Sequence, residues 1–329
     1  MKRIAVGISL VFVVFILATF IAGQTQSAGE PTQPAGNGAP PLSNPLKVAL
    51  LKWYPANQVP TMFGVGKSPY GVAFDGANVW TANNGDGTVS KIRTSDGANV
   101  GTFTIGGAPI GVVFDGASIW VSDNSGNRVT KLRASDGKIL GQFTVGKNPF
   151  WMAFDGQSVW VANSGEGTVT VLRASDGKNL GTFNTGGSIA VAFDGNYIWV
   201  TTYSTTVVRL RRNGQNAGTF PVGHNPLGIA FDGANIWVAN NSDNTVTKLR
   251  ASDGTTLGTF NTPGSPYGIA FDGEDIWVTL PDQASAAKMR PSDGVILYTP
   301  FAGSGAAGIA FDGANMWTAA GLDKIVAKL

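Results

Sequence analysis

One tripeptide, Phe-Asp-Gly, recurs seven times in this chain of 329 residues and divides most of it into units of nearly equal length. Its phenylalanines are spaced 38 to 40 residues apart, at Phe74, Phe114, Phe154, Phe193, Phe231, Phe271 and Phe311. A tryptophan follows each of them by six residues, at Trp80, Trp120, Trp160, Trp199, Trp237, Trp277 and Trp317. Seven copies of a unit of about forty residues indicate a closed repeat architecture.

Each unit reads as four short strands. Apolar residues alternate with a period close to two, as in residues 88–92, and no segment carries the 3.6-residue stripe of an amphipathic helix. In the first copy we expect strands A, B, C and D at 70–74, 78–82, 88–93 and 100–105. Asp-Gly turns join A to B in all copies, and Ser-Asp-Gly turns join C to D in five. We therefore predict an all-β, seven-bladed β-propeller with four antiparallel strands per blade.

The two ends of the repeat region are predicted to share the last blade. The seventh copy stops at Leu329, within its strand C, and so lacks a strand D. Residues 60–66 resemble the strand-D sequence at 101–106, and we expect them to supply the missing outer strand. This closure leaves no unfinished blade to recruit a second chain, which predicts a monomer. Residues 48–53 also read as a strand, for which the repeat gives no place.

The N-terminal part of the chain differs in composition from the repeats. Residues 1–23 begin with Met-Lys-Arg and continue as an uncharged, mostly apolar run, typical of a signal peptide or an N-terminal membrane anchor. Residues 24–47 are rich in Pro, Gly, Ser and Gln and are predicted to be a disordered linker. Residues 48–329 are assigned to the propeller. We expect an exported protein that is secreted, periplasmic or anchored on the outer side of the cytoplasmic membrane.

Composition excludes several classes of function. Charged residues make up 13% of the chain and the net charge is +2, so no basic face is available for nucleic acid. The chain has no cysteine and one histidine, which excludes a cysteine nucleophile and a histidine-rich metal site. No phosphate-binding loop is present. We predict no catalytic residues, no metal site and no cofactor; a hydrolase with paired carboxylates is an alternative.

The repeat resembles the YVTN and NHL types of bacterial β-propeller. The resemblance lies in residues 228–233, 236–240 and 244–249, and it extends over residues 60–329. Proteins with such propellers serve as binding platforms, scaffolds and, more rarely, enzymes, so the resemblance implies the fold more strongly than an activity. It favours a binding or scaffold protein.

The repeats are also distantly similar to those of streptogramin lyases. In that family a metal is held partly by glutamate, a histidine acts as the base, and Glu stands three residues after the strand-B Trp. None of the corresponding residues is Glu in this chain: Asn83, Asp123, Asn163, Thr202, Asn240, Leu280 and Ala320. A lyase or hydrolase of this kind, acting at the mouth of the central channel, is the alternative function.

The loops at the two ends of the blades differ in how much they vary. In a propeller the A-B and C-D turns lie on one face, and the B-C and D-A loops lie on the other. The first set is nearly uniform among the copies, whereas the second varies. Variable loops on a rigid scaffold usually carry binding. We therefore expect a protein, peptide or glycan ligand on the B-C and D-A face.

Departures from the repeat give the candidate ligand-binding residues. Trp151 replaces a glycine found in five other copies, Tyr203 replaces Asn or Ser, and His224 lies in a D-A loop. Three aromatic residues open a strand A. The candidates are Tyr70, Phe150, Trp151, Tyr203, His224 and Tyr267. The aromatic members could stack on a sugar ring or a peptide. Alternatively, Trp151 fills the channel, Tyr203 compensates for a shortened loop, and the strand openers are core residues.

Acidic residues recur on the same face. They follow the strand-B Trp by three to six residues, at Asp86, Asp123, Glu166, Asp243, Asp282 and Asp323. A ring of carboxylates could attract a cation. Alternatively, they are solvated residues at loop tips, and no calcium-binding loop motif is present.

Overall fold

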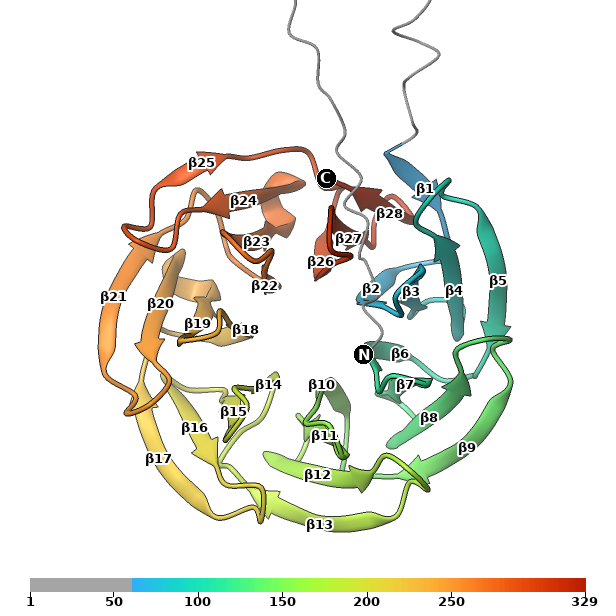
Figure 1. The fold of residues 1–329 in the computed structure, drawn as a ribbon, viewed down its shortest axis with the longest axis horizontal. Coiled ribbons are helices and arrows are strands. Elements are labelled where there is room, and N and C mark those ends of the chain that lie inside the picture. Colours follow the sequence, from blue (N-terminus) through green and yellow to red (C-terminus); the bar gives the residue numbers. More distant parts are fainter. Residues whose placement is uncertain (1–60) are drawn as a thin grey trace, which may run out of the picture. The chain divides into compact units, whose positions relative to one another are not determined.

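The structure is a computed structural model and describes residues 61–329. Seven four-stranded antiparallel sheets form a ring of blades, with one strand of each sheet towards the centre and one at the rim (Figure 1). Two 3-10 turns, η1 (Asn241–Asp243) and η2 (Pro281–Gln283), lie in the B-C loops of blades 5 and 6. The prediction of an all-β, seven-bladed β-propeller is therefore confirmed.

Six blades use four consecutive strands, which run in chain order from the centre to the rim. Blade 1 contains β2 (Pro69–Phe74), β3 (Asn78–Asn83), β4 (Thr88–Arg93) and β5 (Asn99–Thr104); blade 2 contains β6 (Pro109–Phe114), β7 (Ser118–Asp123), β8 (Arg128–Arg133) and β9 (Ile139–Thr144). Blade 3 contains β10 (Pro149–Phe154), β11 (Ser158–Asn163), β12 (Thr168–Arg173) and β13 (Asn179–Asn184); blade 4 contains β14 (Val191–Phe193), β15 (Ile198–Thr201), β16 (Thr206–Leu210) and β17 (Asn216–Pro221). Blade 5 contains β18 (Pro226–Phe231), β19 (Asn235–Asn240), β20 (Thr245–Arg250) and β21 (Thr256–Asn261); blade 6 contains β22 (Ile269–Phe271), β23 (Ile276–Leu280), β24 (Ser285–Met289) and β25 (Ile296–Tyr298).

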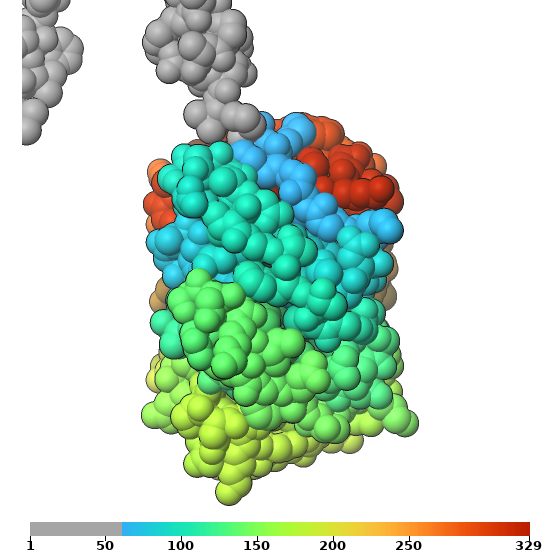
Figure 2. Space-filling model, turned by 90° about the vertical axis from the view of Figure 1, so that its right-hand side faces the viewer, coloured from blue at the N-terminus to red at the C-terminus, as the bar shows by residue number. Residues whose placement is uncertain are grey.

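Blade 7 joins the two ends of the repeat region. It contains β26 (Ala306–Phe311), β27 (Met316–Ala320), β28 (Ile325–Lys328) and, at the rim, β1 (Met62–Gly64). Strands β1 and β28 are antiparallel, with Phe63 opposite Val326. Figure 2 shows the start of the described chain (blue) lying against its end (red). The prediction that residues just before the first copy close the last blade is confirmed.

Three predictions concern residues outside the described range: the signal peptide or anchor at 1–23, the linker at 24–47 and the strand at 48–53. Within residues 61–329, no helix has the length and hydrophobicity needed to span a membrane.

The aspartate of each Phe-Asp-Gly turn binds the tryptophan of its own blade. In blade 5, Asp232 Oδ1 accepts the backbone N–H groups of Ala234 (2.8 Å) and Asn235 (2.6 Å), and Oδ2 accepts the indole N–H of Trp237 (2.7 Å). The carboxylate-to-indole bond recurs at 2.7 to 2.9 Å in all seven blades: Asp75–Trp80, Asp115–Trp120, Asp155–Trp160, Asp194–Trp199, Asp232–Trp237, Asp272–Trp277 and Asp312–Trp317. Because these indoles are at most 3% exposed, their N–H groups need such a partner. This bond explains the strict spacing between Phe-Asp-Gly and Trp.

Each buried indole also joins neighbouring blades. Trp237 packs against Phe260 of the outer strand, with ring centroids 5.8 Å apart, and Lys248 Nζ lies 4.9 Å from the indole centroid. Lys248 Nζ also donates to the backbone carbonyl of Pro291 in blade 6 (2.8 Å). Six blades place a cation over the Trp: Lys91, Lys131, Arg209, Lys248, Lys288 and Lys328. In four blades this cation also binds the backbone of the next blade: Lys91, Lys131, Arg209 and Lys248.

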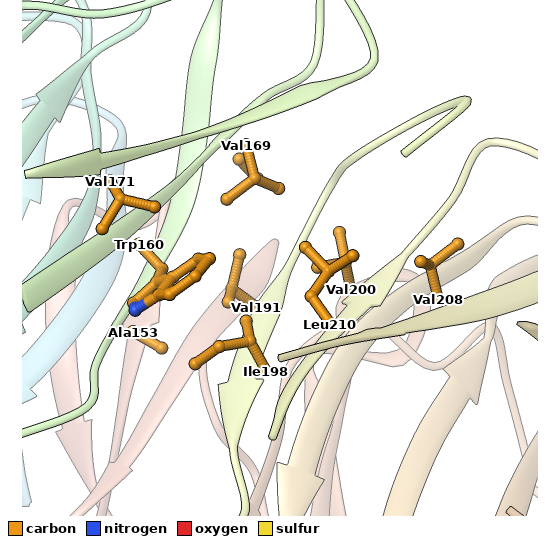
Figure 3. Packing of buried hydrophobic residues seen from close by; sticks show 10 residues of the cluster. Ala153, Trp160, Val169, Val171, Val191, Ile198, Val200, Val208 and Leu210 are labelled. Atoms are coloured by element: carbon orange, nitrogen blue, oxygen red, sulfur yellow. The ribbon is translucent and has the colours of Figure 1, made fainter. Parts of the chain in front are cut away.

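The hydrophobic core consists of the layers between neighbouring blades. Between blades 3 and 4, Trp160 and Val171 face Val191, Ile198 and Leu210 (Figure 3). Val171 stands where other blades have the cation. The backbone carbonyl of Asp155 in that blade instead accepts a hydrogen bond from Arg212 of blade 4 (2.9 Å). A contact from the neighbouring blade thus joins blades 3 and 4 where the repeat lacks its cation.

We expect the Asp–Trp bond to make stability depend on acid pH. Burial would raise the pKa of Asp232, but hydrogen bonds from Trp237, Asn235 and the backbone lower that pKa below its usual range. The stabilisation is therefore present above about pH 4 and is lost as the pH falls through the native pKa. The substitution Asp232→Asn should lower the free energy of unfolding by about 1–3 kcal/mol at pH 7, and by less near pH 3. Denaturant titrations at pH 7 and pH 3 measure the two free energies of unfolding. The control Glu274→Gln, in an exposed turn, should change neither free energy. An equal loss at both pH values in Asp232→Asn would contradict the prediction.

Candidate functional site

Four of the six candidate residues meet at the start of the inner strands. The ring centroid of Tyr70 lies 5.7 Å from that of Phe150, 6.0 Å from that of Trp151 and 5.9 Å from that of Tyr267. Phe150 and Trp151 also touch each other edge to face, at 5.9 Å. These side chains come from blades 1, 3 and 6 and are all half-buried. We call the four residues the aromatic plug.

The two tyrosines of the plug are hydrogen-bonded to each other through their hydroxyl groups. Burial raises the pKa of Tyr70, although the bond to Tyr267 lowers it in part. Burial also raises the pKa of Tyr267 far above its usual range, and the phenols of Tyr70 and Tyr203 act in the same direction. Both phenols are therefore neutral at physiological pH, so they can donate and accept hydrogen bonds but cannot act as a general base.

A cavity of about 160 Å³ lies deeper along the inner strands. Seven aliphatic side chains surround it, one from each blade: Val72, Val112, Met152, Val191, Ile229, Ile269 and Ile309. All stand two residues before the Phe of a Phe-Asp-Gly turn. This ring was not predicted, although the constantly aliphatic position was visible in the repeats. Trp151 belongs to the plug and also lines this cavity. It therefore occupies the channel, as the alternative interpretation of this residue expected.

Tyr203 differs from its counterparts in both exposure and contacts. Asn84, Asn124 and Asn241 donate from their side chains to a proline carbonyl of the next blade, at 3.1 to 3.3 Å. Tyr203 instead has 57% of its surface exposed. The neighbouring loops are joined there by the backbone N–H of Asn225, which donates to the Ser204 carbonyl (3.2 Å). Its exposure argues against a role in packing a shortened loop.

His224 belongs to the same face but contacts an acid rather than the plug. Its Nδ1 lies 2.9 Å from Asp243 Oδ1, and its backbone N–H donates to Asp243 Oδ2 (2.7 Å). The imidazole is 72% exposed. The bond from the backbone N–H is the main cause that lowers the pKa of Asp243. The next residue, Asn225, contacts the loop of Tyr203, which places His224 at the rim of the site.

Five of the six acidic residues of this face bind backbone groups of their own blades. Four of them accept an N–H from a D-A loop, in the pairs Asp86–Lys67, Asp243–His224, Asp282–Ser265 and Asp323–Ser304. Asp123 accepts from Ala108 (2.9 Å) and forms an ion pair with Arg128 (2.9 Å). Across residues 61–329, no three His, Cys, Asp or Glu side chains are grouped so that they could hold a metal ion. These five carboxylates therefore fix loop geometry.

The positions that correspond to the lyase glutamates also have structural contacts. Asn240 is buried and donates to the hydroxyls of Thr245 (3.0 Å) and Thr247 (2.8 Å). Asn83 and Asn163 make the same type of contact in blades 1 and 3.

One exposed residue on this face was missed: Leu322, in the B-C loop of blade 7, is 78% exposed. A single leucine in a loop gives no sequence signal.

Comparisons with known proteins identify the fold. No protein-family model and no curated protein sequence matches this chain. A streptogramin B lyase structure is similar with a TM-score of 0.69 and 19% sequence identity, over 81% of this chain and 95% of that one. A Kuenenia stuttgartiensis hydrazine synthase structure is similar with a TM-score of 0.70 and 16% identity, over 83% of this chain and 98% of that one. At such identities the likeness is one of propeller fold.

The hydroxyl contact within the plug predicts coupled effects on stability. The single substitutions Tyr70→Phe and Tyr267→Phe should each lower the free energy of unfolding by about 1 kcal/mol, because each leaves a half-buried hydroxyl without its partner. The double variant should lose less than the sum of the two. Denaturant unfolding of the four proteins measures the coupling. Tyr298→Phe, at an exposed site, is the control, and strictly additive losses would contradict the contact.

The raised pKa values predict behaviour at alkaline pH. Tyr70 and Tyr267 should stay protonated in the folded protein when exposed tyrosines have ionised near pH 10. The stability they contribute is intact below pH 10 and is lost as the pH rises towards the native pKa values. Tyrosinate absorbance at 295 nm should show a late phase, coincident with unfolding, that is reduced in the Tyr70→Phe, Tyr267→Phe variant. A late phase of unchanged size in that variant would assign it to other tyrosines.

Proposed function

We propose that this protein is an exported, non-enzymatic binding protein whose ligand rests on the B-C and D-A face, over the aromatic plug. The observation that carries the proposal is the convergence of Tyr70, Phe150, Trp151 and Tyr267. These residues stand at positions that vary between copies, and blade stability does not require aromatic residues there. Tyr203 adds an exposed ring on the same face. Partly exposed aromatic residues on a rigid scaffold are typical of binding sites.

The contacts of the polar residues support binding rather than catalysis. Five of the six carboxylates on this face are engaged with loop backbone, and the phenols of the plug are held neutral. His224, the one histidine in the chain, is at the rim and pairs with Asp243. A general base must be able to accept a proton beside the substrate, and the two phenols of the plug are already protonated.

A lyase or hydrolase acting at the channel mouth is the second candidate, and the fold likeness to streptogramin B lyase favours it. The residues weigh against it, because Asn83, Asn163 and Asn240 stand where that resemblance calls for glutamate.

Export is proposed from the apolar run in residues 1–23. Cell fractionation of the producing organism, with N-terminal sequencing of the mature protein, tests the export.

Trp151 provides an intrinsic reporter for binding. The seven blade tryptophans are buried, whereas Trp151 is half-buried in the plug. A ligand that stacks on the plug should change tryptophan emission saturably, and Trp151→Phe should abolish that change. Truncation by Trp151→Ala should weaken binding about tenfold or more, as expected for a central aromatic contact.

The titration uses a panel of soluble oligosaccharides and peptides. Leu140→Ser, on the outer strand of blade 2, is the matched control and should bind normally. If no probe changes the emission, or if the change survives Trp151→Phe, the proposed location of the site is wrong.

A further inference from the structure

The two most exposed large apolar side chains among residues 61–329 both belong to the B-C and D-A face. Leu322 is 78% exposed and Tyr203 is 57% exposed. The others, none above 51%, lie on or beside the outer strands: Met62, Val100, Ile139, Leu140, Leu180, Leu257, Val295, Leu297, Tyr298 and Phe301. Isolated exposed apolar residues are ordinary, but a contiguous set marks an interaction surface.

Tyr203 and Leu322 flank the aromatic plug from opposite sides of the ring. Blade 4, which carries Tyr203, lies across from blades 7 and 1 (Figure 1). Next to Tyr203, the Ser204 carbonyl accepts the Asn225 N–H of the D-A loop of blade 5 (3.2 Å), on the same face. On the other side, Gly321, which precedes Leu322, lies against the backbone of Pro69, which precedes Tyr70. We call Tyr203, Tyr267, Tyr70 and Leu322 the apolar band.

The plug makes this band a surface rather than the entrance to a pocket. Tyr70 touches rings from blades 3 and 6, so side chains already occupy the space between the first residues of the inner strands. A ligand must therefore lie across the band. Leu322, moreover, has neither an aromatic face nor a polar group, so it suits an apolar side chain better than a sugar ring.

The charges around the band favour a basic partner. The B-C and D-A loops and the strand ends that join them carry six carboxylates: Asp86, Asp123, Glu166, Asp243, Asp282 and Asp323. They carry four permanently positive side chains: Lys67, Arg128, Lys147 and Lys324. The face thus has a net charge of −2 with His224 neutral, although the whole chain is at +2. Opposite charge guides association and disfavours acidic partners.

We propose that the ligand is an extended, basic peptide segment whose apolar side chains lie on the apolar band and whose Lys or Arg side chains reach the surrounding carboxylates. This inference rests on the proposed function and specifies its ligand class. In an extended chain, alternate side chains point to opposite sides, so one set can contact the band while the other reaches the rim.

The test uses fluorescein-labelled, end-capped octapeptides in anisotropy titrations of the full chain at 0.15 M salt. A peptide of alternating Leu and Lys should bind at least tenfold more tightly than one of alternating Leu and Glu or one of alternating Ser and Lys. The double variant Tyr203→Ser, Leu322→Ser should weaken binding of the Leu-Lys peptide at least tenfold. The matched control Leu140→Ser, Leu180→Ser removes two equally apolar residues from outer strands and should bind as the parent does.

Three results would overturn the inference: no binding of the Leu-Lys peptide, equal binding of the Leu-Glu peptide, or unchanged affinity in the Tyr203→Ser, Leu322→Ser variant. The emission of Trp151 separates these from failure of the proposed function. If chitohexaose changes that emission and the Leu-Lys peptide does not, the site stands and its ligand is a glycan. If neither probe nor any other member of the panel changes it, both proposals fail.

Discussion

The hydrogen bond from a turn carboxylate to a buried indole is the interaction on which this ring depends. In each blade one aspartate side chain caps the turn between the two inner strands and satisfies the Trp N–H, as Asp232 does for Trp237. The satisfied indole can then be buried against an aromatic ring of the outer strand, which is Phe in six blades and Tyr298 in blade 6. In six blades a cation also lies over the indole. Because several of those cations also bind the next blade, one local bond supports both the sheet and the contact between sheets.

The repeat explains why the fold was predictable. Phe-Asp-Gly and Trp recur in strict register, so their spacing reveals the blades. The seventh copy lacks a strand D, and this missing strand predicts the closure by β1. The four residues of the aromatic plug could be predicted only as separate candidates for ligand binding. The sequence shows that Tyr70, Phe150 and Tyr267 open inner strands, but their meeting depends on the width of the ring and on side-chain directions. The exposure of Leu322 and the bonds from D-A loop N–H groups to the B-C loop carboxylates were not predicted, because a loop residue's exposure and partners follow from tertiary contacts.

The same structure separates two kinds of position. Repeated residues such as Asp232 and Trp237 are buried or bound to their own blade. In the variable B-C loops, carboxylates such as Asp243, Asp282 and Asp323 also bind backbone N–H groups. Two residues that vary between copies are accessible: Trp151 is half-buried and Tyr203 is 57% exposed. Variation on a scaffold that compensates for it, as Arg212 does beside Val171, allows a binding surface to change without opening the ring.

We propose above all that ligand binding belongs to the variable loops at the channel mouth and not to the repeated frame. Hydrogen–deuterium exchange of the protein alone and saturated with ligand tests this most directly. We predict slower exchange confined to the loops around Tyr70, Tyr203, Tyr267 and Leu322, with the A-B turns and outer strands unchanged. Protection centred on the outer strands, or on the turns formed by Phe-Asp-Gly, would contradict it.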